Sequence, residues 1–186
     1  MPLIITREAV PEDFDRYFAE AFEELGPESR HFRFFTAVRE LPPGVLERLA
    51  HVDGMVDAAI IAFDAAADLP NHPEGKPIGV ARWMGNPEGP PELSVTVIDD
   101  YQGLGVGSRL MDALLVLARK RGVRRIIADV LRENCLLYTS DAADDLLCVD
   151  LGGRRTLQKT THQKCVYSYL TTPNPICIHA HNPPPR

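Results

Sequence analysis

The chain has 186 residues, of which 45% are hydrophobic and 25% charged, as expected for one globular domain. Its formal net charge of −6 argues against a nucleic-acid partner, because nucleic-acid phosphates attract a basic surface. No apolar run is long enough to span a bilayer, and the N-terminus does not have the pattern of a signal peptide. We therefore expect a cytoplasmic protein with no membrane and no nucleic-acid partner.

The first part of the chain predicts a strand and a helix. Leu3–Thr6 is short, apolar and partly β-branched, which is typical of a strand. Pro11 opens a helix that ends at Gly26-Pro27. Its apolar residues recur every three or four positions and predict one buried face. They are Phe14, Tyr17, Phe18, Phe22 and Leu25.

An aromatic and basic segment, Pro27–Phe35, comes next. We expect at least two of its three phenylalanines, at positions 32, 34 and 35, to belong to the core. Pro42–Val52 predicts a second helix. Its inward residues would be Val45, Leu46 and Leu49.

The middle of the chain predicts three strands. Met55–Phe63 is rich in Val and Ile, and Pro77–Met84 follows it after the polar loop Asp64–Lys76, so the two form a hairpin. After a turn with three prolines, Leu93–Ile98 predicts the central strand. A long amphipathic helix, Val106–Arg121, and a last strand in the segment 124–131 complete the predicted elements.

The segment between the central strand and the long helix, Gln102–Gly107, reads Gln-Gly-Leu-Gly-Val-Gly. Strand, glycine turn and helix is the usual order for a phosphate site, because glycines permit close backbone approach and the first turn of a helix has unpaired N–H groups. The spacing is not that of a dinucleotide fingerprint, since position 108 is Ser, nor that of a Walker A loop. A glycine-rich helix start without a ligand is the simpler alternative.

The pattern Gln-x-x-Gly-x-Gly, here Gln102, Gly105 and Gly107, resembles the acetyl-CoA pyrophosphate loop of the GNAT acetyltransferase superfamily. The order of the predicted elements is also similar to that of the superfamily from Leu3 to Asn134. The resemblance implies an α/β fold with a mixed, mostly antiparallel sheet flanked by helices. It further implies an N-acetyltransferase with acetyl-CoA as acyl donor and an amine as acceptor.

Within the superfamily, the chain resembles bacterial protein-lysine acetyltransferases, so a protein lysine is a candidate acceptor. The similarity rests on Arg33-Phe34-Phe35, on Asp99–Gly103 and, loosely, on Leu46, Leu49 and Asp53. A non-catalytic acyl-CoA-binding module and an inert fragment of an enzyme are the alternatives to a working transferase.

The resemblance also implies the residues of the site. In the superfamily a backbone N–H of the central strand polarises the thioester carbonyl, which here falls near Val95–Val97. Glu92 matches the general base, which is needed because an amine with a pKa near 10.4 is protonated at pH 7. A solvated turn residue is the alternative for Glu92. The implied cofactor-binding residues are Val97, Gln102, Gly103, Leu104, Gly105, Val106, Gly107, Ser108 and Asn134.

The resemblance stops at Cys135, where superfamily members continue with a helix that carries a Tyr general acid and with two further strands. Cys135–Asp145 and Cys148–Arg155 instead resemble the translation of a transposase-type sequencing adapter. We therefore interpret residues 1–134 as an acetyltransferase domain truncated after its fifth strand, and residues 135–186 as a non-native tail. The tail should be mostly irregular, with 136–143 as a candidate helix and 165–170 as a candidate strand.

All four cysteines lie in this tail. A metal site formed by Cys165, Cys177, His179 and His181 is conceivable, but the spacing offers no C-x-x-C knuckle. We expect neither a metal nor a disulfide there. Tyr138 lies too close to Asn134 to be assigned as the general acid.

Overall fold

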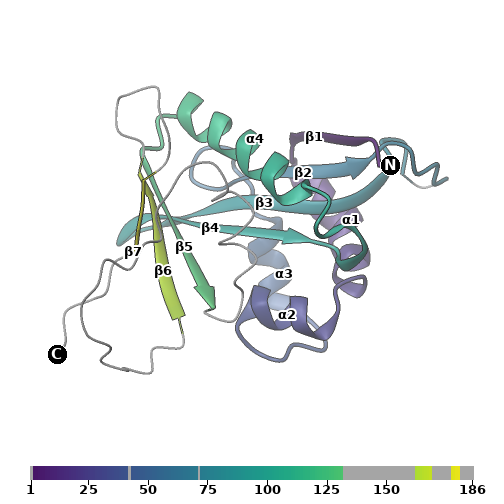
Figure 1. Cartoon of the computed structure of the whole chain (residues 1–186), viewed down its shortest axis with the longest axis horizontal. Helices are drawn as coiled ribbons and strands as arrows, with labels where there is room; N and C mark the ends of the chain where they lie inside the picture. The colour runs from purple at the N-terminus through teal and green to yellow at the C-terminus, as the bar shows by residue number, and fades with distance from the viewer. Residues whose placement is uncertain (1, 42, 71, 132–161, 169–176, 181–186) are drawn as a thin grey trace.

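The computed structural model describes residues 2–41, 43–70, 72–131, 162–168 and 177–180. Its strands form one sheet in the order β1-β2-β3-β4-β5-β6-β7, in which only β4 and β5 are parallel neighbours (Figure 1). The strands are β1 Ile4–Glu8, β2 Ala58–Asp64, β3 Lys76–Asn86, β4 Gly89–Val97, β5 Arg125–Leu131, β6 His162–Ser168 and β7 Cys177–Ala180. The helices are α1 Pro11–Glu23, α2 Pro27–Phe34, α3 Pro43–Ala50, the short 3-10 helix η1 Asp99–Tyr101 and α4 Val106–Lys120. The predicted mixed, mostly antiparallel sheet flanked by helices is therefore confirmed.

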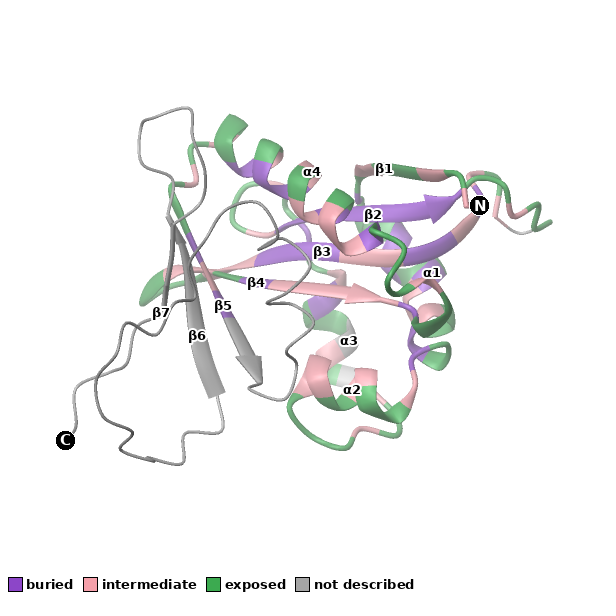
Figure 2. Cartoon of the chain, in the orientation of Figure 1, coloured by how far each residue is buried: buried purple, intermediate pink, exposed green. Residues whose placement is uncertain are grey.

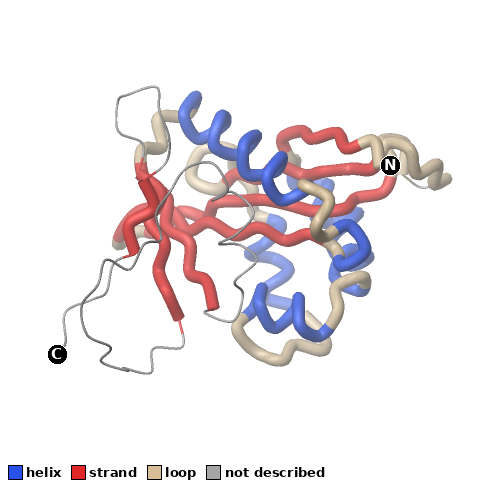
Figure 3. Tube along the Cα trace, in the orientation of Figure 1, coloured by secondary structure: helices blue, strands red, loops and turns tan. Residues whose placement is uncertain are grey.

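Helices cover both faces of the sheet. The long helix α4 packs on one face, and α1, α2 and α3 lie on the other (Figure 3). Because successive strand residues point to opposite faces, Ala58, Ile60 and Ala62 pack with α4, while Ile61 and Phe63 pack with α1. Strand β2 is consequently buried along its whole length (Figure 2).

The start of α1 is fixed by an acidic side chain. Asp13 accepts a hydrogen bond from the Val10 amide at 2.8 Å and two from the Arg7 guanidinium at 2.6 and 2.7 Å. Burial acts to raise the pKa of Asp13, but the hydrogen bonds from Arg7 and Val10 outweigh it and hold the pKa below its ordinary value. The predicted apolar face of this helix is confirmed, since most of its residues are buried: Phe14, Tyr17, Phe22 and Leu25.

Two expectations for the N-terminal half are wrong. The aromatic segment forms α2, and its phenylalanines are not buried: Phe34 packs partly buried against Phe22, while Phe35 is 36% exposed after the helix end. Strand β2 begins at Ala58 rather than Met55, because Asp53 Oδ1 accepts the amides of residues 55, 56 and 57 and holds them in a turn.

The sheet also does not stop at the fifth strand. All seven residues of β5 pair with β6, from Arg125↔Ser168 to Leu131↔His162, and β7 pairs with β6. The expectation that the sheet is truncated after its fifth strand is therefore corrected. The physical reason is that a strand edge offers unpaired N–H and C=O groups, and β6 carries strand-forming residues such as Val166 and Tyr167 that can pair with it.

The candidate strand in the tail is confirmed in part, as it overlaps β6. The candidate helix at 136–143, Tyr138 and His181 lie outside the described residues, so the metal arrangement stays untested. Within the described ranges, no helix combines the length and apolarity that a bilayer crossing requires.

Candidate functional site

Strands β4 and β5 pair at only two positions, Glu92↔Ile127 and Leu93↔Ala128. Beyond Leu93 the two strands diverge (Figure 1). On its other side β4 stays paired with β3, and the Ile98 amide donates to the Ile78 carbonyl at 3.1 Å. Because backbone groups alternate in direction along a strand, the N–H and C=O of Val97 point away from β3. This part of β4 therefore presents backbone hydrogen-bonding groups on the side where β5 has departed.

The glycine loop lies immediately after this edge. Gly103 and Gly105 have φ of 72° and 77°, a region that glycine occupies without strain, and α4 begins at Val106. The first hydrogen bond of the helix is Arg109 N–H to Gly105 O, at 3.2 Å. The amides of Val106, Gly107 and Ser108 precede this bond, so the regular pattern of the helix gives them no intrahelical partner. They form the positive end of a fifteen-residue helix, where an anion is favoured.

The space in front of this helix start is open. A Cβ built on Gly103, Gly105 or Gly107 would meet no other atom within 4 Å. Leu104 is 50% exposed, whereas Val106 as a whole residue is only 1% exposed; Gly107 and Ser108 are partly exposed. The loop is thus a backbone cradle whose three glycines leave room for a ligand.

Unlike the glycines of the loop, Gln102 has a side chain that forms hydrogen bonds within the protein. Its Nε2 lies within hydrogen-bond distance of Ser29 Oγ at 3.0 Å, Val97 O at 3.1 Å and Asp99 Oδ1 at 3.2 Å. Asp99 Oδ2 in turn accepts the Gly26 amide at 3.1 Å. The side chain of Gln102 thus joins the loop to the end of β4 and to α2, and its N–H groups are used within the protein.

A second contact positions the loop from the other side. Tyr101 donates its hydroxyl to Asp64 Oδ2 at 3.0 Å, at the end of β2. Burial acts to raise the pKa of Asp64, but hydrogen bonds from the Ala66 and Leu3 amides and from Tyr101 outweigh it, so the pKa lies below its ordinary value. Burial and the Asp64 carboxylate both raise the pKa of Tyr101. The loop is therefore held between β2 and α2.

Glu92 lies where β4 and β5 are still paired, and it is exposed. Alternation places Glu92, Ser94 and Thr96 on one face of β4. Thr96 lines a cavity under α1 and α2, so this is the face that α2 covers. Burial lowers the pKa of Arg33 on α2, and the charge of Glu92 opposes that shift.

The structure brings Val97 and Gln102–Ser108 together at one end of β4, with Glu92 on the same strand. Asn134 lies outside the described residues. Sequence reasoning missed the contact of the loop with Ser29 and the buried Arg82 of β3. An arginine between Ala81 and Trp83 in an apolar strand could have been noticed.

Comparison with known proteins identifies the family to which the chain belongs. Residues 12–138 match the Acetyltransferase (GNAT) family. Over 126 residues the chain is 32% identical to acetyltransferase PA5475 of Pseudomonas aeruginosa, which covers 66% of this chain and 63% of that protein. The chain therefore spans less than two thirds of the length of this relative.

Solved structures share the fold. The GNAT domain of S. lividans PAT superposes with a TM-score of 0.66 at 23% identity, covering 88% of this chain and 89% of that one. The protein yncA of Salmonella typhimurium, solved with its cofactor acetyl-CoA, gives a TM-score of 0.55 at 17% identity and covers 73% of this chain and 74% of that one. At these identities the likeness concerns the fold alone.

Proposed function

Because the chain belongs to the acetyltransferase (GNAT) family, we propose that it transfers the acetyl group of acetyl-CoA to an amine. One observation carries the proposal: a glycine loop with unpartnered helix amides directly follows the strand whose edge is left open by the divergence of β4 and β5. The family uses acetyl-CoA, and one structural neighbour was solved with it.

The described residues fit this acyl donor. The amides of Gly107 and Ser108 suit its pyrophosphate, because both residues are partly exposed and no described atom lies within 4 Å of a Cβ built on Gly103, Gly105 or Gly107. The amide-bearing arm of the donor can hydrogen-bond along β4 at Val95, whose backbone groups, like those of Val97, point away from β3. The pyrophosphate and the amide-bearing arm of one extended molecule would thus be bound by backbone groups of two consecutive segments, the start of α4 and strand β4.

The chemistry then needs a proton acceptor and a donor to the carbonyl oxygen. Acetyl-CoA supplies a thioester carbonyl that is activated toward amines. Glu92 accepts the proton of the ammonium, so that the free amine can form the C–N bond as the C–S bond breaks. The Val97 N–H donates to the carbonyl oxygen, where negative charge develops. The departing sulfur takes up a proton, and the described residues supply no assigned acid for this step.

The acceptor is proposed more narrowly as a primary amine, with a protein lysine among the candidates. Glu92 supports an amine, because a carboxylate beside the acceptor both attracts the ammonium and receives its proton. Arg33-Phe34-Phe35, through its likeness to bacterial protein-lysine acetyltransferases, supports a lysine.

A thiol-release assay tests the proposal. The purified full chain, verified as folded by circular dichroism, is mixed with acetyl-CoA and either small primary amines or a lysine peptide, and free CoA is measured. Amine-dependent CoA release is expected. Acetyl-CoA binding without release would identify a non-catalytic binding module, and a folded chain with neither binding nor release would overturn the proposal.

A further inference from the structure

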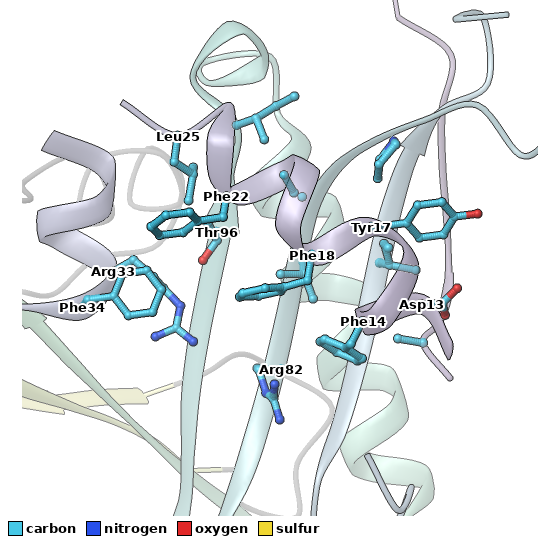
Figure 4. Close-up of a pocket in the computed structure, with 17 residues that line it drawn as sticks. Asp13, Phe14, Tyr17, Phe18, Phe22, Leu25, Arg33, Phe34, Arg82 and Thr96 are labelled. Atoms are coloured by element: carbon cyan, nitrogen blue, oxygen red, sulfur yellow. The ribbon is translucent and has the colours of Figure 1, made fainter. Parts of the chain in front are cut away.

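A cavity of about 60 Å³ lies between α1, α2 and the sheet (Figure 4). A single water needs only about 10–15 Å³, so the cavity has room for a small polar group. Its walls are mainly apolar, and they include Phe14, Phe18, Phe22 and Phe34. Two guanidinium groups line it as well, Arg33 from α2 and Arg82 from β3. In Figure 4 Arg82 lies below the aromatic rings, and Arg33 lies beside Phe34 and below Phe22.

Arg82 is 2% exposed, although it carries a charge. Its Nη1 donates to the Leu49 carbonyl at 2.7 Å and its Nη2 to the His51 carbonyl at 3.4 Å. Its Nε is buried and has no hydrogen-bond partner among the described residues. Burial, and then the positive charge of Arg33, lowers the pKa of Arg82 to about 10. A buried charge with an unused donor requires an anion or further hydrogen bonds to offset its desolvation.

No carboxylate in the described part of the chain forms an ion pair with either arginine. Asp13 also lines the cavity, but its oxygens accept from Arg7. Asp57 acts on Arg82, and Glu92 on Arg33, through charge alone. Arg33 otherwise lies over the ring of Phe34, at 5.1 Å from the ring centroid. The cavity therefore combines two positive charges with apolar walls and leaves their hydrogen-bonding capacity partly unused.

We propose that this cavity binds a carboxylate carried by the acceptor amine. The inference rests on the proposed acetyl transfer, because it places the acceptor on the face of β4 that carries Glu92 and Thr96. Thr96 connects the two parts of the site: it lines the cavity and lies on the same face of β4 as Glu92. An acceptor with opposite charges at its two ends matches this order, with its ammonium at Glu92 and its carboxylate at Arg33 and Arg82. Such a carboxylate belongs either to a free amino acid or to an acidic side chain beside a lysine.

The test compares matched acceptors. Initial rates are measured with amino acids and with the corresponding carboxamides, and with lysine peptides whose neighbouring residue is Glu or Gln. The KM of the carboxylate-bearing member should be lower by about tenfold in one of the two pairs, since hydrogen bonds to charged groups are strong. The pair that shows the difference identifies the source of the carboxylate. Equal KM values in both pairs would overturn the inference while leaving acetyl transfer intact.

Arg33→Gln provides the matched variant, because Arg33 is partly exposed. It should remove the tenfold advantage of the carboxylate-bearing acceptor over its uncharged partner. Arg39→Gln is the control, since Arg39 is an exposed arginine beyond the end of α2, and it should retain the advantage. An advantage that survives in Arg33→Gln would contradict the assignment.

A binding measurement separates this inference from the proposed function. Small carboxylates such as butyrate, compared with butyramide, should raise the unfolding midpoint of the full chain without acetyl-CoA, and Arg33→Gln should abolish the increase. That result would stand even if no acetyl transfer were detected. A midpoint that butyrate and butyramide shift equally would count against a carboxylate site.

Discussion

Gln102 Nε2 and Ser29 Oγ lie 3.0 Å apart although 73 positions separate the two residues in the sequence. The contact connects the glycine loop with α2, the helix that carries Arg33 and covers β4. Asp99 reinforces it, because its carboxylate lies within hydrogen-bond distance of both Gln102 Nε2 and the Gly26 amide. The loop proposed to bind the acyl donor and the helix proposed to face the acceptor are thus joined directly.

Replacing Gln102 by Ala should weaken acetyl-CoA binding more than replacing Ser29 by Ala. The first change removes the contacts with Val97 and Asp99 as well as the one with Ser29, and a neutral hydrogen bond contributes about 0.5–1.5 kcal/mol. We expect the Kd to rise by about tenfold or more for Gln102→Ala and by less than about tenfold for Ser29→Ala, measured by calorimetry. A larger loss for Ser29→Ala would show that Gln102 does not organise the loop.

Gly105→Val should abolish measurable acetyl-CoA binding. Residue 105 has φ of 77°, which costs an L-residue about 1–2 kcal/mol and a β-branched one more, and the new side chain would occupy the cradle. Gly44→Val is the control, because an added Cβ at Gly44 also meets nothing within 4 Å but lies on α3, away from the loop. Calorimetry with acetyl-CoA checks both. Unchanged affinity in Gly105→Val would exclude the loop as the pyrophosphate site.

Glu92→Gln should lower kcat for amine acetylation by about 10²-fold or more at pH 7, with little change in the KM for acetyl-CoA, because the amide cannot accept the proton. Glu88→Gln, a change in the turn between β3 and β4, is the matched control and should leave kcat unchanged. Rates are measured by CoA release between pH 6 and 9. Wild-type rates across that range would transfer the base role from Glu92 to another group.

Asp13→Asn should reduce stability near neutral pH by about 1–3 kcal/mol, since Asp13 accepts from Arg7 and Val10. The pKa of Asp13 is depressed in the folded state, so its contribution is present above the unfolded value of about 3.9 and is lost as pH falls below it. Urea unfolding at pH 7, 5 and 3 should therefore show a difference between wild type and variant that shrinks only at pH 3. The exposed Asp15→Asn should show a much smaller difference, and a pH-independent deficit in Asp13→Asn would contradict the linkage.

Local patterns predicted most of the elements. The apolar faces of α1 and α4 follow from helical spacing, and the glycine loop follows from its place between a strand and a helix. The exposure of Met55 and Val56 was missed because three backbone hydrogen bonds to Asp53, rather than hydrophobicity, decide the local conformation. For the same reason, an apolar run alone did not locate the start of β2.

The site depends on relationships that a single sequence does not display. The divergence of β4 from β5 and the contact of Gln102 with Ser29 each join segments far apart in the chain. The pairing of β6 with β5 was not predicted, although a strand at 165–170 was, because strand addition depends on a partner edge elsewhere in the chain. Arg33 and Arg82 come together only when α2 folds over β3 and β4.

The two-position junction of β4 and β5 has a consequence for how the sheet opens. Strands β1 to β4 form one antiparallel set, and strands β5 to β7 form another. A donor molecule bound along β4 would therefore lengthen the short contact through which these two sets are connected. Amide hydrogens of Val95 and Val97 should then exchange with solvent far more slowly when acetyl-CoA is bound. The acyl donor would serve the fold as a short additional strand, and the protein would be most rigid when it is ready to react.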